Sequence, residues 1–228
     1  LYTMNGTDME RQDLAGEAYF MRAFSYFMLA NLYGKPYHPA TANEDLCVPL
    51  NKEIGLSDKM MKRATNAAVY AQMEEDINKA IQCFKAIGGE KTIFRPNLPS
   101  AYLLASRIAL FQETYDETIL YCDSVFKVAT PPLYKLQEKK DHYFFSLANK
   151  EILLSYGLTS LETHMKEDFR YTGNLVVSDD LLALYSEDDL RLTNYFKNTI
   201  GNQTRPTNKQ YSVYTPIKWT KNLSLIHI

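Results

Sequence analysis

Acidic side chains in adjacent positions are the residues of this sequence that most invite a catalytic interpretation. They form four clusters, Glu74–Asp76, Glu167–Asp168, Asp179–Asp180 and Glu187–Asp189. A glycosidase needs two carboxyl groups about 5 to 10 Å apart across its substrate. Neighbouring residues on a helix point about 100° apart, so none of these spacings directs two carboxylates to one point. We expect solvated helix faces and helix caps here, and we predict that the protein is not an enzyme.

Histidines and cysteines also lack a pattern that indicates catalysis or metal binding. The histidines lie at positions 38, 142, 164 and 227, without H-E-x-x-H or H-x-H spacing. The cysteines Cys47, Cys83 and Cys122 are too far apart for a C-x-x-C motif. Cys83 and Cys122 fall in apolar helical patterns, where we expect small buried hydrophobes. The sequence therefore predicts no metal site and no cofactor.

Arg22 is the sharpest single residue, because it is the only charge between Ala18 and Tyr33. A buried guanidinium requires a carboxylate or several carbonyl oxygens. Asp76 or Glu17 could supply the carboxylate, so we predict a structural ion pair, with contact to a ligand as the alternative. Glu17 lies near the start of the same helix, where the helix dipole favours an acid, and we expect it to be structural.

The helix that carries Arg22 is predicted to begin at Thr7 or Asp8 and to end at Gly34, with Pro36 beyond it. A helix that is apolar all round is either buried or in a membrane. A membrane span needs roughly 20 mostly apolar residues, and this run is shorter and contains polar residues. We therefore expect the central helix of a soluble α-helical domain, covered by the helices that follow.

Three more helices are predicted after a long loop at Lys35–Ser57. They span about 66–86, 100–112 and 115–128, and Gly88 and Gly89 end the first of them. In the last helix an apolar stripe contains Ile119, Cys122 and Phe126. The short break before it predicts an antiparallel hairpin. These helix pairs look like tetratricopeptide repeats without a strict 34-residue period.

Beyond Pro131 and Pro132 the pattern changes. Residues 151–156 are predicted to form a strand, and residues 174–177 a weaker one. Short helices are expected at 178–185 and 186–195. Residues 198–222 are polar and rich in turn residues. We place a helical scaffold at 1–134 and a loop-rich ligand-face region at 135–228.

Charge gives little information about partners. The 228 residues contain 25 basic and 27 acidic side chains, a net charge of −2. No polybasic stretch indicates nucleic acid or anionic lipid, and we predict no nucleic-acid partner. The chain has 17 Tyr but one Trp. Tyr is the usual surface residue that both stacks and forms hydrogen bonds.

The order of the segments resembles the SusD/RagB family of outer-membrane nutrient-binding lipoproteins of Bacteroidota. Five pieces carry the resemblance, and together they cover most of residues 10 to 196. They are GEAYFMRAFSYFMLANLYGKPY, RATNAAVYAQMEEDINKAIQCF, RPNLPSAYLLASRIALFQETYDETILYCDSVF, NKEILLSY and SDDLLALYSEDDLR. The family's signal peptide, lipid-modified cysteine and a later helix have no counterpart here, so an internal fragment is expected. The last five residues, SLIHI, resemble translated adapter sequence.

The resemblance implies a mainly α fold of degenerate tetratricopeptide-like hairpins, with a loop-rich region and a few short strands. It also implies a cell-surface lipoprotein that captures oligosaccharides or peptides. Its partner would be a SusC-like TonB-dependent transporter, and its only membrane contact an N-terminal lipid anchor missing from this chain. The alternative is a helical-repeat scaffold that binds another protein.

Aromatic residues on loops are the candidate ligand contacts, because sugars offer flat apolar faces ringed by hydroxyls. The candidates are Tyr37, Tyr211, Tyr214 and Trp219. Trp219 lies near Lys218 and Lys221, and we predict a stacking platform there, with packing of Trp219 on the helical core as the alternative. The family's ligand contacts lie in variable loops, so no residue is carried over from it.

Overall fold

The structure is a computed structural model, and it describes residues 5–52, 60–88, 92–129, 151–156, 178–201 and 211–216. For 193–201 and 211–216 the description covers the backbone. The chain divides into two compact units, one up to Pro131 and one from Pro132 onward. Each unit is described by itself. The domain boundary predicted after residue 134 stays a prediction.

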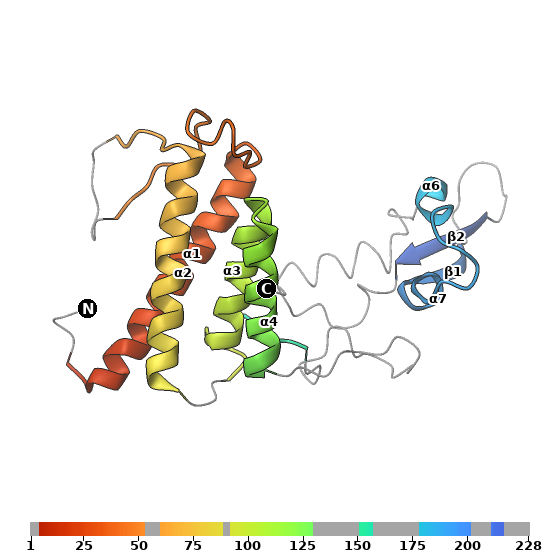
Figure 1. The fold of residues 1–228 in the computed structure, drawn as a ribbon. Helices are drawn as coiled ribbons and strands as arrows, with labels where there is room; N and C mark the ends of the chain where they lie inside the picture. Colours follow the sequence, from red (N-terminus) through yellow and green to blue (C-terminus); the bar gives the residue numbers. More distant parts are fainter. Residues whose placement is uncertain are drawn as a thin grey trace. The chain divides into compact units, whose positions relative to one another are not determined.

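Helix α1 (Asp8–Tyr33; Figure 1) is fixed at both ends by its caps. The Thr7 hydroxyl accepts from the Glu10 N–H at 3.2 Å, and the Glu10 carboxylate accepts from the Thr7 N–H at 2.8 Å. This capping box satisfies two N–H groups at the helix start. At the other end, a Cβ on Gly34 would lie 2.6 Å from the Ala30 carbonyl oxygen. Only glycine fits there, and α1 ends where the sequence predicted.

Helix α2 (Asn66–Ile87) lies along α1 and forms the core with it. The contact is close because Gly16 has no side chain: a Cβ there would lie 2.7 Å from the Phe84 ring and 3.0 Å from the Cys83 Cβ. The fully buried side chains along this interface are apolar residues from both helices, Phe20, Ala23, Val69, Met73 and Ala80. Their burial supplies most of the hydrophobic stabilisation of the pair.

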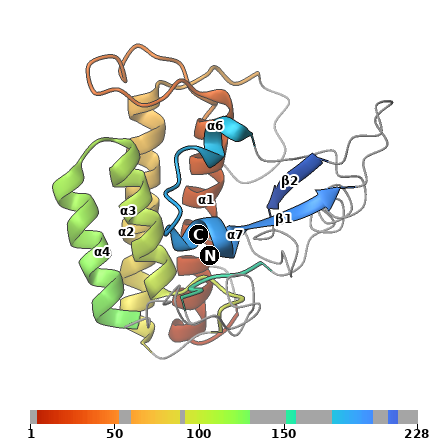
Figure 2. The same ribbon diagram turned by 90° about the vertical axis from the view of Figure 1, so that its right-hand side faces the viewer.

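Helices α3 (Leu98–Phe111) and α4 (Tyr115–Ala129) form the predicted antiparallel hairpin, and α3 packs on α2 (Figure 2). Glu113 adopts φ +64° in the tight connection. α3 begins two residues before the prediction. The reason is that Asn97 caps it, accepting from the Ser100 N–H at 2.9 Å, and Pro99 is tolerated in a first turn.

The expected cover of α1 is present on one side only. α2 packs along it, whereas α3 touches it at a few places, among them an edge-to-face contact of Phe27 with Phe111 at 5.1 Å. Within the described residues, the face of α1 opposite α2 keeps Met21, Met28 and Leu32 exposed. The prediction of a helix covered all round is therefore wrong for the part of the chain that the structure describes. No described helix is long and apolar enough to cross a membrane.

The second unit contains α6 (Asp179–Leu182), α7 (Leu190–Tyr195) and a hairpin of β1 (Phe196–Gly201) and β2 (Tyr211–Pro216). Ser178 caps α6 as predicted, accepting from the Leu181 N–H at 3.3 Å. The strands are antiparallel, with Phe196 opposite Pro216. The sequence missed this hairpin, because its polar residues suggested turns.

The strand predicted at 151–156 is absent. These residues form a turn and irregular backbone, although Ile152 and Leu154 are buried. A short run of aliphatic residues does not specify a hydrogen-bonded neighbour, and a strand requires one. The weaker strand predicted at 174–177 lies outside the described residues.

Candidate functional site

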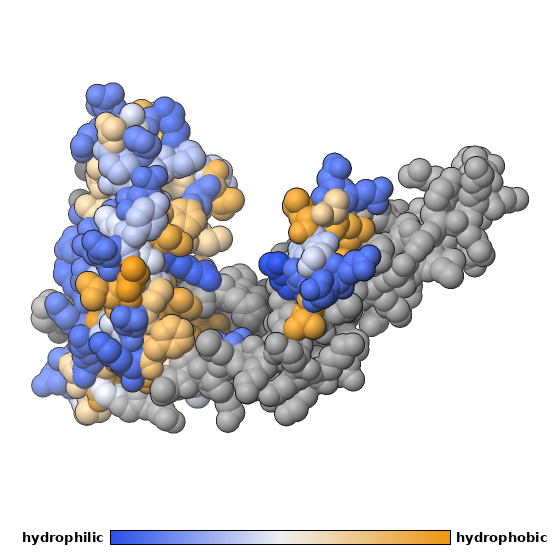
Figure 3. All heavy atoms as spheres, turned by 45° about the vertical axis from the view of Figure 1, so that its right-hand side comes forward, coloured by the Kyte–Doolittle hydropathy of each residue, from blue (hydrophilic) through white to orange (hydrophobic). Residues whose placement is uncertain are grey.

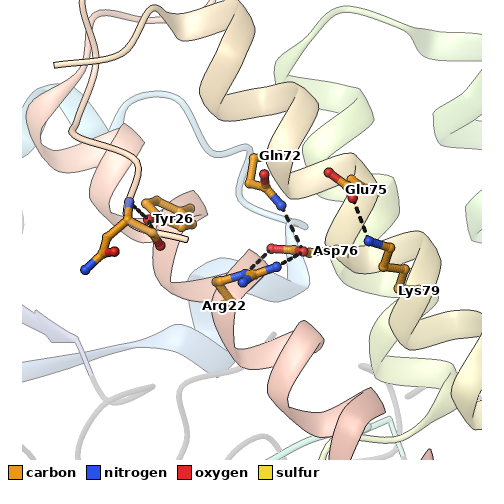
Figure 4. A network of polar contacts seen from close by, with 7 residues as sticks. Arg22, Tyr26, Gln72, Glu75, Asp76 and Lys79 are labelled. Atoms are coloured by element: carbon orange, nitrogen blue, oxygen red, sulfur yellow. Dashed lines mark hydrogen bonds and ion pairs between the residues drawn. The ribbon is translucent and has the colours of Figure 1, made fainter. Parts of the chain in front are cut away.

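Arg22 and Asp76 form a bidentate ion pair between α1 and α2 (Figure 4). The Arg22 Nε donates to Asp76 Oδ2 at 2.7 Å, and Nη2 donates to Oδ1 at 2.6 Å. The Asp76 side chain is fully buried, whereas 35% of the Arg22 side chain is exposed. The hydrogen bond to Asp76 raises the pKa of Arg22, because it favours the charged form. Of the two carboxylates expected for Arg22, the structure pairs it with Asp76.

Polar and aromatic neighbours hold this ion pair in place. The Gln72 amide donates to Asp76 Oδ1 at 3.0 Å. The Tyr19 ring lies close to two cations, with the Arg22 guanidinium 5.7 Å and the Lys79 ammonium 5.4 Å from its centroid. These contacts join α1 to α2 and leave Asp76 no exposed surface. Asp76 is therefore an anchor and not an accessible acid or base.

Three adjacent acids of α2 confirm that neighbouring carboxylates diverge. Asp76 points to Arg22, the Glu75 carboxylate pairs with Lys79 at 2.6 Å, and the Glu74 carboxylate accepts from the Gln112 amide at 2.6 Å. Each carboxylate thus has its own partner on a different side of the helix. Such an arrangement does not provide the two facing carboxyl groups of a glycosidase. The cluster Glu167–Asp168 lies outside the described residues.

Glu17 pairs with an arginine other than Arg22, the partner considered for it in the sequence. Its carboxylate pairs with Arg95 at 2.8 Å, and the Arg95 guanidinium also lies 3.9 Å from Asp13. Arg95 precedes α3, so this cluster joins α1 to the start of the α3–α4 hairpin. The contact raises the pKa of Arg95.

An ordered loop follows α1, and three carbonyl groups hold it to Arg63. The Arg63 guanidinium donates to the carbonyl oxygens of Leu46 at 2.8 Å, of Tyr33 at 3.3 Å and of Cys47. One of these belongs to the last turn of α1, where unpaired carbonyls favour a cation. The Tyr26 hydroxyl extends the attachment by donating to the Asn51 carbonyl at 3.1 Å and accepting from its N–H at 2.8 Å.

Tyr37, one of the predicted ligand contacts, lies on this loop. Its ring packs against Tyr70 of α2, with centroids 4.6 Å apart and planes at 52°. Tyr70 is buried, which raises the pKa of its hydroxyl to about 12. Tyr37 is half-buried, so only part of its surface is free for a ligand.

The other three predicted contacts lie in the second unit. Tyr211 and Tyr214 are in β2, opposite Gly201 and Asn198 of β1. Trp219 lies outside the described residues, so its role stays a prediction. The structure therefore brings Tyr211 and Tyr214 onto one strand and places Tyr37 in the other unit.

One exposed aromatic residue was missed by the sequence reasoning. Tyr33, the last residue of α1, is 67% exposed and directly precedes the loop of Tyr37. The sequence signal for the exposure of Tyr33 was its position, because the last turn of a helix beside a loop reaches solvent more often than the helix centre. Tyr33 and Tyr37 are the aromatic residues with which the end of α1 and this loop could contact a ligand.

Metal and thiol chemistry receives no support from the described residues. No group of three or more His, Cys, Asp or Glu side chains there could hold a metal ion. The three cysteines are free, with Cys47 buried and Cys83 and Cys122 half-buried. Burial raises the pKa of the Cys47 and Cys83 thiols, which favours the unreactive neutral form.

Comparison with protein families gives a match that spans α1, α2 and most of α3. Residues 2–110 match the third SusD-like family, described as starch-binding and associating with the outer membrane. Over this stretch the chain is similar to SusD-like proteins. The resemblance seen in the sequence is thereby confirmed. No curated protein matches the chain.

Solved structures share the fold of this chain. A SusD superfamily protein from Bacteroides thetaiotaomicron has a TM-score of 0.76 at 22% identity, over 93% of this chain and 50% of its own. A putative sugar-binding protein from Bacteroides vulgatus has a TM-score of 0.74 at 20% identity, over 97% of this chain and 50% of its own. The mainly α fold is confirmed, and the chain spans about half the length of these two structures.

A further solved structure is described by its ligand. It is a laminarin-binding SusD-like protein with a TM-score of 0.51 at 22% identity. The match covers 71% of this chain and 34% of that protein.

Proposed function

We propose that this protein binds carbohydrate at the cell surface. The observation that carries the proposal is the match of residues 2–110 to a family described as starch-binding and outer-membrane-associated. Related folds described as sugar-binding and laminarin-binding support the same ligand class. The ligand is an oligosaccharide or, as a less supported choice, a peptide.

The chemistry of the described residues fits binding without catalysis. Tyrosine side chains offer a flat face to a sugar ring and a hydroxyl to its rim. Tyr33 ends α1 and Tyr37 lies on the loop that follows it, which Arg63 holds in place, so little ordering entropy is lost when a ligand binds them. The acids with described partners take part in ion pairs and helix caps. One solved structure of similar fold is described as a putative sugar-binding protein. Binding with no chemical step is therefore the proposed activity.

Native gel electrophoresis in polysaccharide-containing gels tests this proposal. Soluble starch and laminarin are the first polymers to try, and retardation by at least one polysaccharide is expected. Tyr33→Ala and Trp219→Ala should reduce the retardation several-fold. Tyr115→Ala is the matched control, because Tyr115 is similarly exposed, at 60% against 67% for Tyr33, but lies on α4. If the control weakens binding as much as Tyr33→Ala does, the loop is not the ligand contact.

Delivery to a transporter is the second part of the proposal. We propose that the protein is an outer-membrane lipoprotein that passes captured oligosaccharides to a SusC-like TonB-dependent transporter. The genomic test is a neighbouring transporter gene and an upstream lipid-modified cysteine in the complete reading frame. The biochemical test is co-purification of the transporter with the tagged protein from outer membranes. A reading frame without a lipid attachment site, beside unrelated genes, would contradict delivery but leave carbohydrate binding open.

A scaffold that binds another protein is the alternative function. The specific observation in its favour is the apolar surface of α4, where Ile119 and Phe126 are exposed. Extended helical repeats use such surfaces for protein partners. Native gel electrophoresis distinguishes the two functions, since a scaffold would bind a protein partner and show no retardation by any polysaccharide.

Incubation of the intact protein with the same polysaccharides checks the absence of catalysis. We expect no new reducing ends. Sugar release that depends on a Glu or Asp side chain would show that the protein is an enzyme.

A further inference from the structure

Three basic side chains from three different segments lie close together beside the α1–α2 pair. They are Arg22 of α1, Lys79 of α2 and Lys52 of the loop that follows α1. The Arg22 guanidinium lies 5.7 Å and the Lys79 ammonium 5.4 Å from the centroid of the Tyr19 ring. We call these three cations together with Tyr19 the basic cluster.

The backbone beside Lys52 is held in place by α1. The Tyr26 hydroxyl donates to the Asn51 carbonyl at 3.1 Å and accepts from the Asn51 N–H at 2.8 Å. Tyr26 lies four residues after Arg22 on the same helix. The residue before Lys52 is therefore attached to α1 about one helical turn from Arg22.

All three cations lie near the Glu75 carboxylate. Lys79 donates to Glu75 at 2.6 Å, and this hydrogen bond is the main cause that lowers the pKa of the Glu75 carboxyl. The nearby charges of Lys52 and Arg22 lower the same pKa further. The loop lysine and the two helix cations thus act on one area of the surface.

The carboxylates of this area leave part of the positive charge without a partner. Asp76 is fully buried and takes Nε and Nη2 of Arg22, which leaves Nη1, and 35% of the Arg22 side chain is exposed. Lys52 has no ion-pair partner among the described residues. Three cations therefore meet two carboxylates, Glu75 and Asp76, in a chain whose net charge is −2.

The basic cluster offers the groups that recognise an acidic sugar. Guanidinium and ammonium groups donate charge-assisted hydrogen bonds to a carboxylate. Tyr19, which is half-buried, adds a ring edge and a hydroxyl for the sugar itself. Figure 3 shows apolar residues at the surface of the first unit, but among the described residues α2 has no large exposed apolar side chain. A polar ligand suits this surface better than an apolar one.

We propose that the basic cluster binds the carboxylate of a uronic-acid residue, so that the ligand is an acidic polysaccharide. The proposal rests on the proposed carbohydrate binding and adds a contact distinct from Tyr33 and Tyr37. The carboxylate accepts from Arg22 Nη1 and from the two lysines. Asp76 holds the Arg22 guanidinium from its buried side (Figure 4).

Isothermal titration calorimetry with uronic-acid oligosaccharides tests the proposal. The protein from the complete reading frame is titrated with oligomers of galacturonate, glucuronate and mannuronate. The methyl ester of each oligomer is the matched ligand, because it keeps the sugar chain and removes the charge. We expect at least one acid to bind about tenfold more tightly than its ester, and to lose affinity as the NaCl concentration rises from 50 to 500 mM.

Single-charge variants show whether the basic cluster makes the contact. Lys52→Gln and Lys79→Gln should each weaken binding of the acid about three- to fivefold. Lys127→Gln is the matched control, because it removes the same charge from an exposed position on α4, and its affinity should stay unchanged. Glu75→Gln should tighten binding several-fold, since it removes the carboxylate that competes for Lys79.

Failure of this proposal differs from failure of carbohydrate binding. Retardation by starch or laminarin without any binding of the three acids would overturn the acidic ligand and leave carbohydrate binding standing. Equal affinities for acid and ester, or an equal loss in Lys127→Gln, would also overturn the role of the basic cluster. Absence of binding to every neutral and acidic sugar would contradict carbohydrate binding as well.

Discussion

Removal of the Arg22 guanidinium should destabilise the protein far more than removal of its partner. Arg22→Met keeps most of the length of the side chain but leaves the Asp76 carboxylate with only the Gln72 amide, in a site where Asp76 has no exposed surface. An unpaired buried charge of this kind costs about 3 to 5 kcal/mol. We expect a loss of that size in the free energy of unfolding.

The reverse change leaves a charge that can reach water. In Asp76→Leu the Arg22 guanidinium, already about one-third exposed, can turn into solvent, so we expect a loss of about 1 to 2 kcal/mol. The double variant Arg22→Met/Asp76→Leu replaces the pair by apolar groups, which is often close to neutral. It should therefore be more stable than Arg22→Met alone.

Urea unfolding followed by circular dichroism at 222 nm measures these differences through the helical unit. Glu75→Ala is the control, because Glu75 is the adjacent acid in an exposed ion pair with Lys79, and its urea midpoint should stay unchanged. Equal losses in the two single variants, with a double variant that loses their sum, would refute the reasoning. The pair would then not be an anchor.

Three further predictions concern packing, the loop and pH. Gly16→Ala should cost about 1 to 2 kcal/mol of unfolding free energy in the same urea assay, because the new Cβ would lie 2.7 Å from the Phe84 ring; an unchanged midpoint would show that α2 can move away. Arg63→Ala should speed amide hydrogen exchange at residues 46–51 about tenfold, since the loop loses its bonds to Arg63, and unchanged exchange there would show that the clamp is dispensable. Burial raises the pKa of Tyr70 from about 10 to about 12. The contribution of its protonated hydroxyl to the free energy of unfolding is therefore complete below pH 10 and is lost as the pH rises toward 12. This contribution amounts to about 2 to 3 kcal/mol. Between pH 9 and pH 11.5 the free energy of unfolding should therefore fall less in Tyr70→Phe than in the natural protein. An equal fall in both proteins would contradict the raised pKa of Tyr70.

The helices of the first unit were predictable because their signals are local. Thr7 and Glu10 form a capping box within one turn, and Gly34 and Gly88 end their helices through backbone geometry. A capping residue followed by proline also explains why α3 starts at Leu98, two residues before the predicted start. Helix boundaries thus depend on residues a few positions apart.

Contacts between distant segments were harder to predict. The aliphatic run in residues 151–156 suggested a strand, but strand formation depends on a partner that local pattern does not specify. The β1–β2 hairpin joins segments whose polar residues suggested turns. For Arg22, charge alone left two carboxylates open, and the antiparallel course of α2 brings Asp76 to it.

The apolar stripe predicted on α4 also shows that a local pattern does not specify which elements pack together. Periodicity correctly placed Ile119, Cys122 and Phe126 on one face of the helix, yet that face is not the one packed on α3. Periodicity tells which face is apolar and not what covers it. For the candidate site, Tyr37 was correctly placed on a loop, but its contact with Tyr70 depends on a fold that the pattern alone does not provide.

Isothermal titration calorimetry with oligosaccharides tests the central claim most directly. The protein from the complete reading frame is titrated with fragments of the polysaccharide that retards it most in gels. Carbohydrate binding predicts a saturable heat of binding, weakened in Tyr33→Ala and unchanged in the Tyr115→Ala control. No binding heat with any oligosaccharide, from folded protein that instead retains a protein partner, would contradict the claim.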